Sequence, residues 1–248
     1  MIIAIANQKG GVAKTTSTIA LAGLLAEVCS CLAVDFDPQG HLSLGLGVRV
    51  QKGQSTAYHV LTDETVRAKE TIVDTQCGVK LIPADIALAK GEKESLGEIG
   101  NTGLLKRKLA PLKKEYDHIV IDCPPSLGLL TINALAAADL VLVPVQCQFF
   151  GLDGLWKFIE TVKGVRSREV NPHLQILGIL PTMADNTNTT QDGLNTLKEK
   201  LKGIRIFEPV PKSVKFPESN LARKPIHAYT KEQKLVAPYK AIVKQIVG

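Results

Sequence analysis

The 248-residue sequence has no long apolar run, no paired cysteines and few aromatic residues, which make up 4% of it. No apolar run reaches 18 residues, which excludes a membrane-spanning helix. The five cysteines are odd in number and form no Cys-x-x-Cys pair, which is typical of reduced thiols in a cytoplasmic protein. Strand-like sequence begins at Ile2 and leaves no room for a signal peptide, so we expect a cytoplasmic location.

Repeats, low-complexity tracts and linkers are also absent, and we expect residues 1–248 to form a single domain around one large core. Continuous apolar runs of strand length occur at residues 2–6, 32–36, 80–82, 118–121, 140–145, 176–180 and 204–207. Segments with helical periodicity lie between many of them, at 18–28, 129–137, 154–165, 194–201 and 235–246. This pattern predicts an α/β fold, a doubly wound and mostly parallel sheet with helices on both faces, whose ligands bind at the carboxyl ends of the strands.

Positive charge is concentrated at the C-terminal end. Residues 198–248 contain 12 Lys and Arg against 4 Asp and Glu, a net charge of +8, whereas the preceding 197 residues contain 18 and 20 and carry −2. This segment predicts a surface that binds a polyanion. Because few aromatic residues are interleaved and no zinc-finger or helix-turn-helix pattern occurs, we expect salt-dependent contact with the phosphates of duplex DNA, without sequence preference. The alternative is a basic surface that is merely solvated.

A glycine-bearing loop, Lys-Gly-Gly-Val-Ala-Lys-Thr-Thr at residues 9–16, joins the first apolar run to the first helical segment. The backbone N–H groups of such a loop and the positive end of the helix dipole face one anion. Lys14 can reach the β- and γ-phosphates of a nucleotide, and the Thr15 hydroxyl can ligate Mg²⁺. The strict P-loop pattern requires glycine where the chain has Ala13, and it assigns no role to Lys9. If Ala13 takes a positive φ, its Cβ costs about 1 kcal/mol, and we expect slightly weaker nucleotide binding.

Two more apolar runs end in carboxylates. Asp35 and Asp37 close the run at 32–36, and their spacing points both side chains the same way from an extended chain. The alternative for this pair is a solvated turn capped by aspartates. Asp122 follows the run at 118–121, where a Walker B carboxylate holds Mg²⁺ through water. Two prolines come next and make a stiff loop that can respond to a γ-phosphate as a unit.

With these motifs in this order, the sequence resembles the ParA/MinD family of deviant-Walker ATPases, and within it the small ParA/Soj-type partitioning ATPases. The resemblance extends from residue 1 almost to the C-terminus. The motifs that carry it are the deviant Walker A loop at 9–16, Asp-x-Asp-Pro-Gln at 35–39, Asp-Cys-Pro-Pro-Ser at 122–126 and Val-Pro-Val-Gln at 143–146. The resemblance implies a P-loop NTPase fold, with ATP and Mg²⁺ as cofactors.

The resemblance also implies roles for individual residues. Lys9, Lys14 and Asp37 form the catalytic set: Lys9 reaches the nucleotide of the partner subunit in a dimer, and Asp37 orients the attacking water. Thr15, Asp37 and Asp122 hold the metal, with Asp35 in its outer shell. The nucleotide-binding set, whose last three members flank the adenine, is Lys9, Gly10, Gly11, Val12, Ala13, Lys14, Thr15, Thr16, Asp122, Thr182, Met183 and Pro211.

The function implied by the resemblance is that of an ATPase that forms a homodimer with ATP, binds double-stranded DNA non-specifically and positions a cargo on the nucleoid. The cargo could be a plasmid, a chromosome origin or a compartment such as a carboxysome. Hydrolysis is slow alone and is stimulated by a ParB-like or cargo-adaptor protein, and no membrane is expected. The residues expected at the DNA are Lys198, Lys202, Lys212, Lys215, Arg223, Lys231 and Lys234.

Two other functions stay open. Residues 234–247 are basic and amphipathic, as in a MinD-like ATPase that cycles on a membrane. Against this, Pro238 suits a first helical turn, and the apolar stripe suits packing on the sheet. A nucleotide-dependent reductase component would use cysteines such as Cys123 as ligands, which the cysteine spacing disfavours. Gln148 stands where family members often carry an acid beside the dimer interface, so a cross-dimer contact at this position is in question.

Overall fold

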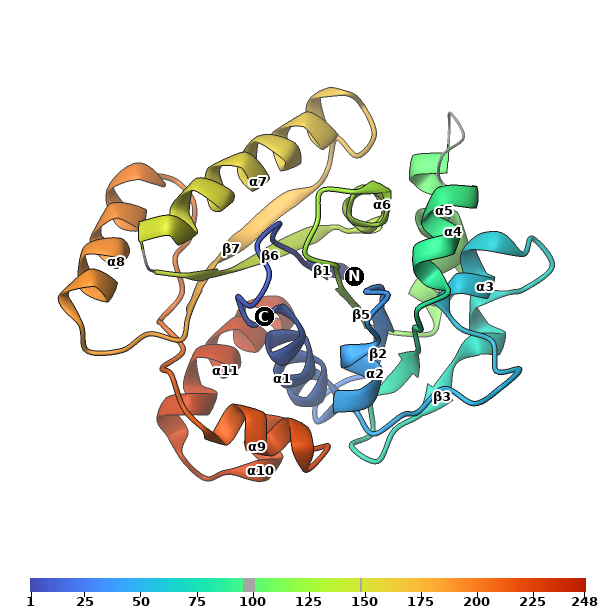
Figure 1. Ribbon diagram of the computed structural model, residues 1–248, viewed down its shortest axis with the longest axis horizontal. Helices are drawn as coiled ribbons and strands as arrows, with labels where there is room; N and C mark the ends of the chain where they lie inside the picture. The colour runs from blue at the N-terminus through green and yellow to red at the C-terminus, as the bar shows by residue number, and fades with distance from the viewer. Residues whose placement is uncertain (96–100, 148) are drawn as a thin grey trace.

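The computed structural model describes residues 1–95, 101–147 and 149–248, which form a seven-stranded sheet with helices on both faces (Figure 1). The strand order is β3-β4-β2-β5-β1-β6-β7, and every pairing is parallel except that of β3 with β4. The predicted doubly wound α/β fold is therefore confirmed. The strands are β1 (Ile2–Ile5), β2 (Cys31–Asp35), β3 (Val73–Asp74), β4 (Lys80–Ile82), β5 (His118–Asp122), β6 (Leu140–Gln146) and β7 (Gln175–Thr182).

Helices cover each face of the sheet and create two apolar clusters. Successive residues of β1 alternate between them: Ile2 and Ala4 face one cluster, Ile3 and Ile5 the other, which explains the continuous apolar run. The first cluster includes side chains of α3 (Ala57–Thr62), α5 (Leu104–Leu109), α6 (Leu129–Ala137), α7 (Phe149–Ser167) and α8 (Asn188–Lys200). The second includes side chains of α1 (Lys14–Ala26), α2 (His41–Gly45), α10 (Ile226–Tyr229) and α11 (Gln233–Val247).

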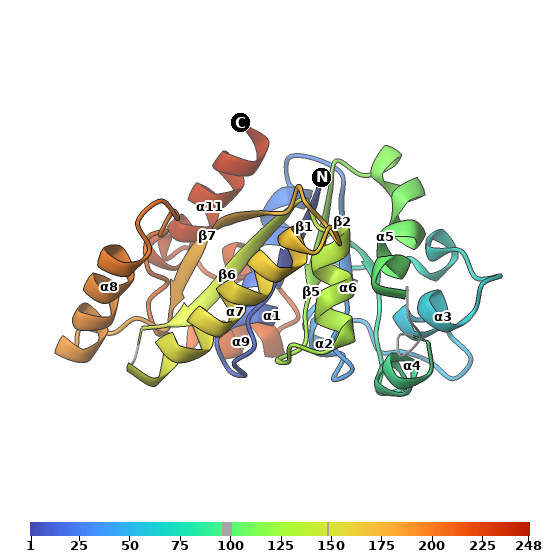
Figure 2. The same cartoon turned by 90° about the horizontal axis from the view of Figure 1, so that it is seen from above.

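The remaining elements are short. They are α4 (Leu88–Ser95), α9 (Lys215–Leu221) and the 3₁₀ helices η1 (Ala68–Thr71), η2 (Asn101–Gly103) and η3 (Ala110–Lys114). Seen from above, α8 lies beyond β7 at one end of the sheet, and α3, α4 and α5 lie at the other (Figure 2).

One predicted strand is wrong. Residues 204–207 form no strand, and their bridge to β7 joins Ile206 to Ile179. Pro181 and the proline at position 209 lack the N–H groups that would continue a regular ladder, so the segment contacts β7 only through isolated hydrogen bonds, such as that of the Val210 amide to the Pro181 carbonyl oxygen at 2.8 Å. The other six apolar runs lie in strands of the sheet. Gln148, named for a cross-dimer contact, lies outside the described residues.

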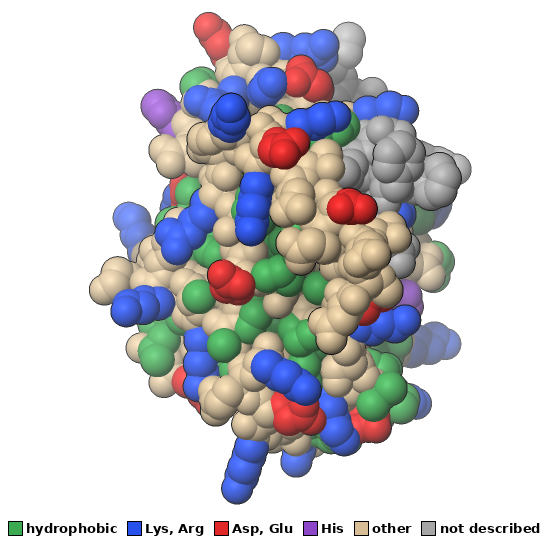
Figure 3. Space-filling model, turned by 90° about the vertical axis from the view of Figure 1, so that its left-hand side faces the viewer, with side chains coloured by type: hydrophobic (Ala, Val, Ile, Leu, Met, Phe, Trp, Pro, Cys, Tyr) green, Lys and Arg blue, Asp and Glu red, His purple; other side chains and the backbone are tan. Residues whose placement is uncertain are grey.

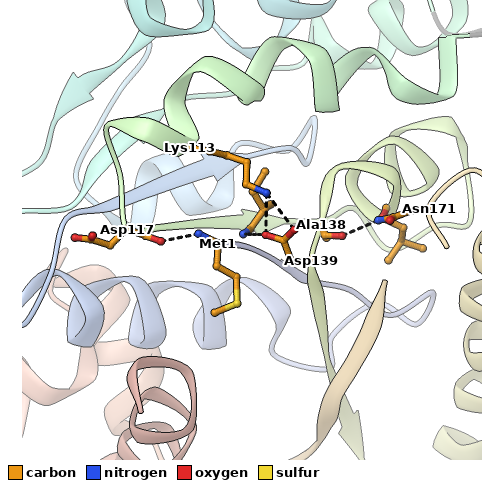
Figure 4. Close-up of polar contacts among 8 residues, drawn as sticks. Met1, Lys113, Asp117, Ala138, Asp139 and Asn171 are labelled. Carbon is orange, nitrogen blue, oxygen red and sulfur yellow. Dashed lines mark hydrogen bonds and ion pairs between the residues drawn. The ribbon is translucent and has the colours of Figure 1, made fainter. Parts of the chain in front are cut away.

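A polar network holds the amino ends of three central strands (Figure 4). The Met1 amine donates to the carbonyl oxygen of Asp117 at 2.6 Å, just before β5. The Asp139 carboxylate, just before β6, accepts from the Ile2 amide at 2.6 Å and pairs with the Lys113 ammonium at 3.1 Å. These contacts support the register that brings the carboxyl ends of β1, β5 and β6 together at the opposite edge.

The apolar stripe of α11 is part of the core. Leu235, Val236, Tyr239 and Ile242 are buried in the cluster that also contains α1, and the two helices are in contact. Pro238 is the sixth residue of α11 and is buried, so its predicted place in the first turn is wrong. No helix of the described ranges combines the length and apolar character needed to cross a bilayer.

Candidate nucleotide-binding site

The loop at residues 9–16 connects β1 to α1, and Lys14 is the first residue of the helix. Two residues of the loop have left-handed backbone, Gly11 with φ 71° and Ala13 with φ 64°. Glycine adopts this conformation freely, whereas the Cβ of Ala13 makes it unfavourable by about 1 kcal/mol. The backbone condition for weaker nucleotide binding is therefore met, and the weaker affinity itself stays a prediction.

Lys14 is buried at the base of this loop, with 7% of its surface exposed. Its ammonium donates to the carbonyl oxygen of Lys9 at 3.1 Å. Burial lowers the pKa of Lys14, while the carboxylates of Asp122 and Asp37 act in the opposite direction. The Lys14 ammonium is buried and donates to a neutral carbonyl oxygen, so an anion placed in the loop would stabilise it.

Asp122 ends β5 and is fully buried beneath α1. Its two oxygens accept hydrogen bonds from the hydroxyls of Thr15, at 2.7 Å, and Thr18, at 3.0 Å. Burial, together with the nearby carboxyl of Asp35, raises the pKa of Asp122 to about 8. The predicted Walker B carboxylate thus lies directly against the predicted metal-ligating hydroxyl.

Asp35 lies opposite Asp122 in the register of β2 and β5. Its Oδ2 accepts hydrogen bonds from the Ser43 amide and hydroxyl at 2.8 and 2.7 Å, which ties β2 to α2. Burial raises the pKa of Asp35 to about 7. Because these bonds occupy the carboxylate, its evident task is to position the segment that carries Asp37. The predicted outer-shell role of Asp35 stays a prediction.

Asp37 lies two residues beyond the end of β2 and is largely buried. Its Oδ1 accepts a hydrogen bond from the Gln39 amide at 3.0 Å, and its charge acts on both Lys14 and Asp122. The structure thus brings the predicted catalytic lysine, the two carboxylates and Thr15 to one edge of the sheet.

These residues also fit a magnesium ion. Within the described ranges, no group of three or more His, Cys, Asp and Glu residues could enclose a metal. Mg²⁺ does not require such a cage, because it keeps several waters and binds through one or two protein oxygens together with phosphate oxygens. The Thr15 hydroxyl, backed by Asp122, offers this incomplete set.

A cavity of about 350 Å³ opens beside the loop, and all three residues predicted to flank the adenine line it. The Thr182 hydroxyl donates to the carbonyl oxygens of Val12 and Val145 at 3.1 and 3.2 Å, which joins the loop to β6 and β7. Besides Thr182, the cavity is lined by Ala13, Thr16, Met183, Val210, Pro211, Lys212, Ser213, Phe216, Pro217, Asn220 and Tyr239. A cavity with largely apolar walls next to an anion-binding loop suits a purine base.

Lys9 is half-buried at the start of the loop. Its backbone amide donates to the Asn7 side chain at 3.0 Å, and its carbonyl accepts from Lys14. The Lys9 ammonium makes no hydrogen bond or ion pair with any residue that the structure describes. Within one subunit, this cation therefore has no assigned contact.

The residues expected at DNA do not form one continuous stripe. Lys198 is on α8 and Lys202 follows it, whereas Lys212 lines the cavity beside the loop. On the face toward α8, Lys and Arg side chains surround an apolar area and alternate with acids (Figure 3). The remaining four are on or beside α9 and α11, and two of them are paired, Lys215 with Glu218 at 2.9 Å and Lys234 with Glu232 at 3.5 Å, while Arg223 and Lys231 are exposed.

Three side chains that organise the site were not foreseen from the sequence. Thr18 holds Asp122, Ser43 holds Asp35, and the Asn7 amide donates to the carbonyl oxygen of Pro144 at 2.7 Å. Thr18 is three residues after Thr15, on the same face of a helix, and that spacing could have identified it. Ser43 and Asn7 act across different elements, and no local pattern indicates their partners.

Comparison with known proteins agrees with this geometry. A family model described as an AAA domain matches residues 1–176. The sporulation initiation inhibitor protein Soj of Bacillus subtilis is 39% identical over 251 residues, which cover 100% of this chain and 98% of Soj. The chromosome partitioning protein ParA of Myxococcus xanthus is 39% identical over 252 residues, covering 99% of this chain and 87% of that protein.

Two solved structures also resemble the whole chain. The ATP complex of a single-residue variant of Cyanothece McdA has a TM-score of 0.92 at 25% identity, covering 100% of this chain and 96% of that one. The cobyrinic acid a,c-diamide synthase of Mycobacterium smegmatis, with a bound ATP analogue and magnesium, has a TM-score of 0.84 at 34% identity, covering 99% and 93%. The fold and the loop define the class of P-loop NTPases. Within that class, the chain belongs to the ParA/Soj family of partitioning ATPases.

Proposed function

We propose that this protein hydrolyses ATP to ADP and phosphate, and that ATP with Mg²⁺ assembles it into a homodimer across two facing loops. The observation that carries the proposal is the Lys9 ammonium, which lies at the start of the loop and has no partner among the described residues. A second P-loop with its triphosphate supplies the anion that such a cation requires. Dimerisation then depends on the γ-phosphate, so ATP acts as the assembly switch.

The chemistry follows from the residues around the loop. The loop amides and Lys14 hold the β- and γ-phosphates, and Asp37 orients the attacking water. Thr15 and Asp122 would hold Mg²⁺, which supplies charge neutralisation at the phosphates. Thr182, Met183 and Pro211 enclose the base. Lys9 adds positive charge from the opposite subunit as negative charge shifts toward the leaving oxygen.

The dimer also doubles the basic surface of residues 198–248. Non-specific binding to duplex DNA then strengthens by avidity, without new contacts. Hydrolysis separates the subunits and releases DNA, and a ParB-like or cargo-adaptor protein accelerates this step. The protein thereby positions a cargo on the nucleoid, within the cytoplasm. The burial of the α11 stripe against α1 favours this function over the membrane-cycling alternative.

The test is dimerisation measured by light scattering with Mg²⁺ and either ATP or ADP. We expect the wild-type protein to form dimers with ATP and monomers with ADP. Lys9→Ala should bind ATP yet remain monomeric, whereas Asp37→Ala should form dimers that persist because turnover is lost. Normal turnover in Asp37→Ala would remove Asp37 from its role, and ATP-dependent dimers in Lys9→Ala would refute the cross-subunit contact.

Co-sedimentation separates the DNA and membrane functions. With ATP, we expect the protein to pellet with plasmid DNA and not with vesicles of anionic phospholipid. Binding to the vesicles without binding to DNA would support a MinD-like function instead.

A further inference from the structure

A second cavity, of about 590 Å³, lies away from the nucleotide site, between η1, α5 and η3. Its floor is apolar and includes Ala68, Leu104 and Leu112. Both η1 and α5 belong to the β3 end of the sheet, whereas α8 lies at the β7 end (Figures 1 and 2). This cavity is therefore distinct from the C-terminal basic segment, and we call it the basic cavity for the reason that follows.

Four cations line the basic cavity, against two acids, Glu64 and Glu115. The cations are Arg67, Lys69, Arg107 and Lys108. This excess is unusual, because residues 1–197 carry a net charge of −2. Cations gathered around an apolar floor form a site for a ligand that carries both apolar and negatively charged groups.

Part of the rim is fixed by its own contacts. The Lys108 ammonium donates to the carbonyl oxygens of Asp63 and Val66 at 2.9 and 3.0 Å, which fastens α5 to the loop before η1. Lys69 pairs with Glu115 at 2.6 Å and so joins η1 to the end of η3. The Lys108 contacts hold α5 in place before any ligand arrives, which reduces the cost of binding, whereas the exposed Lys69–Glu115 pair adds little.

The two arginines of the rim are left for a ligand. Arg67 is paired with Glu70 at 3.1 Å, but its side chain is 84% exposed, so this contact is weak. Arg107 is exposed and has no acidic partner in the part of the chain that the structure describes. A guanidinium binds a carboxylate through two parallel hydrogen bonds, so both arginines are suited to acidic side chains.

We propose that the basic cavity binds an acidic peptide segment of a partner protein, with an apolar side chain on the floor and carboxylates on Arg67 and Arg107. Duplex DNA fits less well, because its backbone has no apolar group for the floor and its phosphates would meet Glu64 and Glu115. The chain enters β5 from η3 at the amino end of that strand, opposite the edge with the P-loop. A partner bound here therefore leaves the nucleotide site accessible, and the proposal does not depend on the proposed function.

The test is fluorescence anisotropy with a labelled octapeptide of six glutamates and two leucines, at 50 mM salt. We expect binding to the wild-type protein that is at least 10-fold weaker in Arg67→Glu/Arg107→Glu. The matched control is Arg166→Glu/Arg168→Glu, which reverses two exposed arginines at the end of α7 and makes the same change in net charge. This control should change the dissociation constant less than 2-fold. An all-glutamate octapeptide should bind several-fold more weakly than the probe.

Each other outcome contradicts the proposal. If the probe does not bind the wild-type protein, the proposed site does not exist. If both double variants lose the same affinity for the probe, the attraction is non-specific. Equal affinity for the two peptides shows that the floor is not used. A 24-base-pair duplex serves as the second ligand, and a specific loss of duplex binding in Arg67→Glu/Arg107→Glu would reassign the cavity to nucleic acid. Unchanged circular dichroism and melting temperature confirm that both variants are folded.

Discussion

At the scale of single residues, position 13 shows how one side chain modifies a shared motif. The backbone there has φ 64°, and the alanine retains a Cβ where glycine would be unstrained. Sequence reasoning identified the departure from the strict pattern, but its consequence depended on the backbone angle. That angle is set by the turn between β1 and α1, which the sequence indicates only as a loop.

We expect Ala13→Gly to bind ATP more tightly, by roughly 5-fold if about 1 kcal/mol of strain is removed. The measurement is titration with a fluorescent ATP analogue in the presence of Mg²⁺. Gly11→Ala is the reciprocal control, since φ is 71° there and, apart from its chain neighbours, no atom of the described residues lies within 4 Å of an added Cβ, so it should bind more weakly. Unchanged or poorer binding in Ala13→Gly would contradict the prediction.

The buried carboxyl of Asp122 predicts a pH dependence of stability. Its pKa of about 8 in the folded protein exceeds the ordinary value of 3.8, so the folded state retains a proton that the unfolded state has lost. The unfolding free energy of the nucleotide-free protein should therefore fall as the pH rises from about 4 to about 8. Asn cannot ionise, so Asp122→Asn removes this pH dependence. We expect the variant to be more stable than the wild type by roughly 1–3 kcal/mol at pH 8.

Urea unfolding at pH 5 and pH 8, without nucleotide or metal, measures the effect. The stability advantage of Asp122→Asn should be larger at pH 8. An advantage that does not grow with pH would show that Asp122 is ionised throughout this range.

At the scale of elements, the predicted strands and long helices are present because their apolar residues repeat with the period of the structure. The run at 204–207 has the same composition but fails as a strand, because Pro181 and the proline at position 209 interrupt the regular ladder between this segment and β7. Short elements such as α2 and α9 were not foreseen, because tertiary contacts rather than periodicity position them. For α2, the contact is that of Ser43 with Asp35.

At this scale, we predict the effect of Thr182, which joins β7 to the P-loop. Thr182→Val keeps the shape of the side chain but removes the hydrogen bonds to Val12 and Val145. We expect the unfolding free energy to fall by about 1–2 kcal/mol and ATP to bind several-fold more weakly, because the loop loses its support. Chemical denaturation and nucleotide titration measure the two effects. Thr182→Ser retains the hydroxyl, so a similar loss of affinity in that variant would exclude this explanation.

At the scale of the whole molecule, positive charge gathers in the C-terminal segment and, separately, around the basic cavity. The total for residues 198–248 revealed the first of these. The basic cavity at the other end of the sheet was hidden in a segment whose net charge is negative. The total for residues 1–197 does not show it, because acids elsewhere in that range outweigh these cations, which come from two separate segments, residues 67–69 and α5.

At this scale, we predict the contribution of two lysines of residues 198–248 to DNA binding. If Lys198 and Lys202 each contact a DNA phosphate in the ATP-bound dimer, the double variant with alanine at both positions should bind duplexes of different sequence equally weakly. The slope of log affinity against log salt should decrease by about 1 for each lysine per subunit. Anisotropy measured from 50 to 200 mM salt gives the slope. An unchanged slope would place the DNA contact elsewhere.

The sequence by itself determined the fold class, the phosphate-binding loop and the identity of the carboxylates at the strand ends. These follow from local spacing and periodicity, which a linear chain displays. Only the tertiary structure decided that Thr18 and Ser43 hold two of those carboxylates, that Thr182 supports the loop, and that the stripe of α11 is buried. Each of these depends on which elements lie next to each other, and strand order is set by packing across the whole sheet rather than by any single segment.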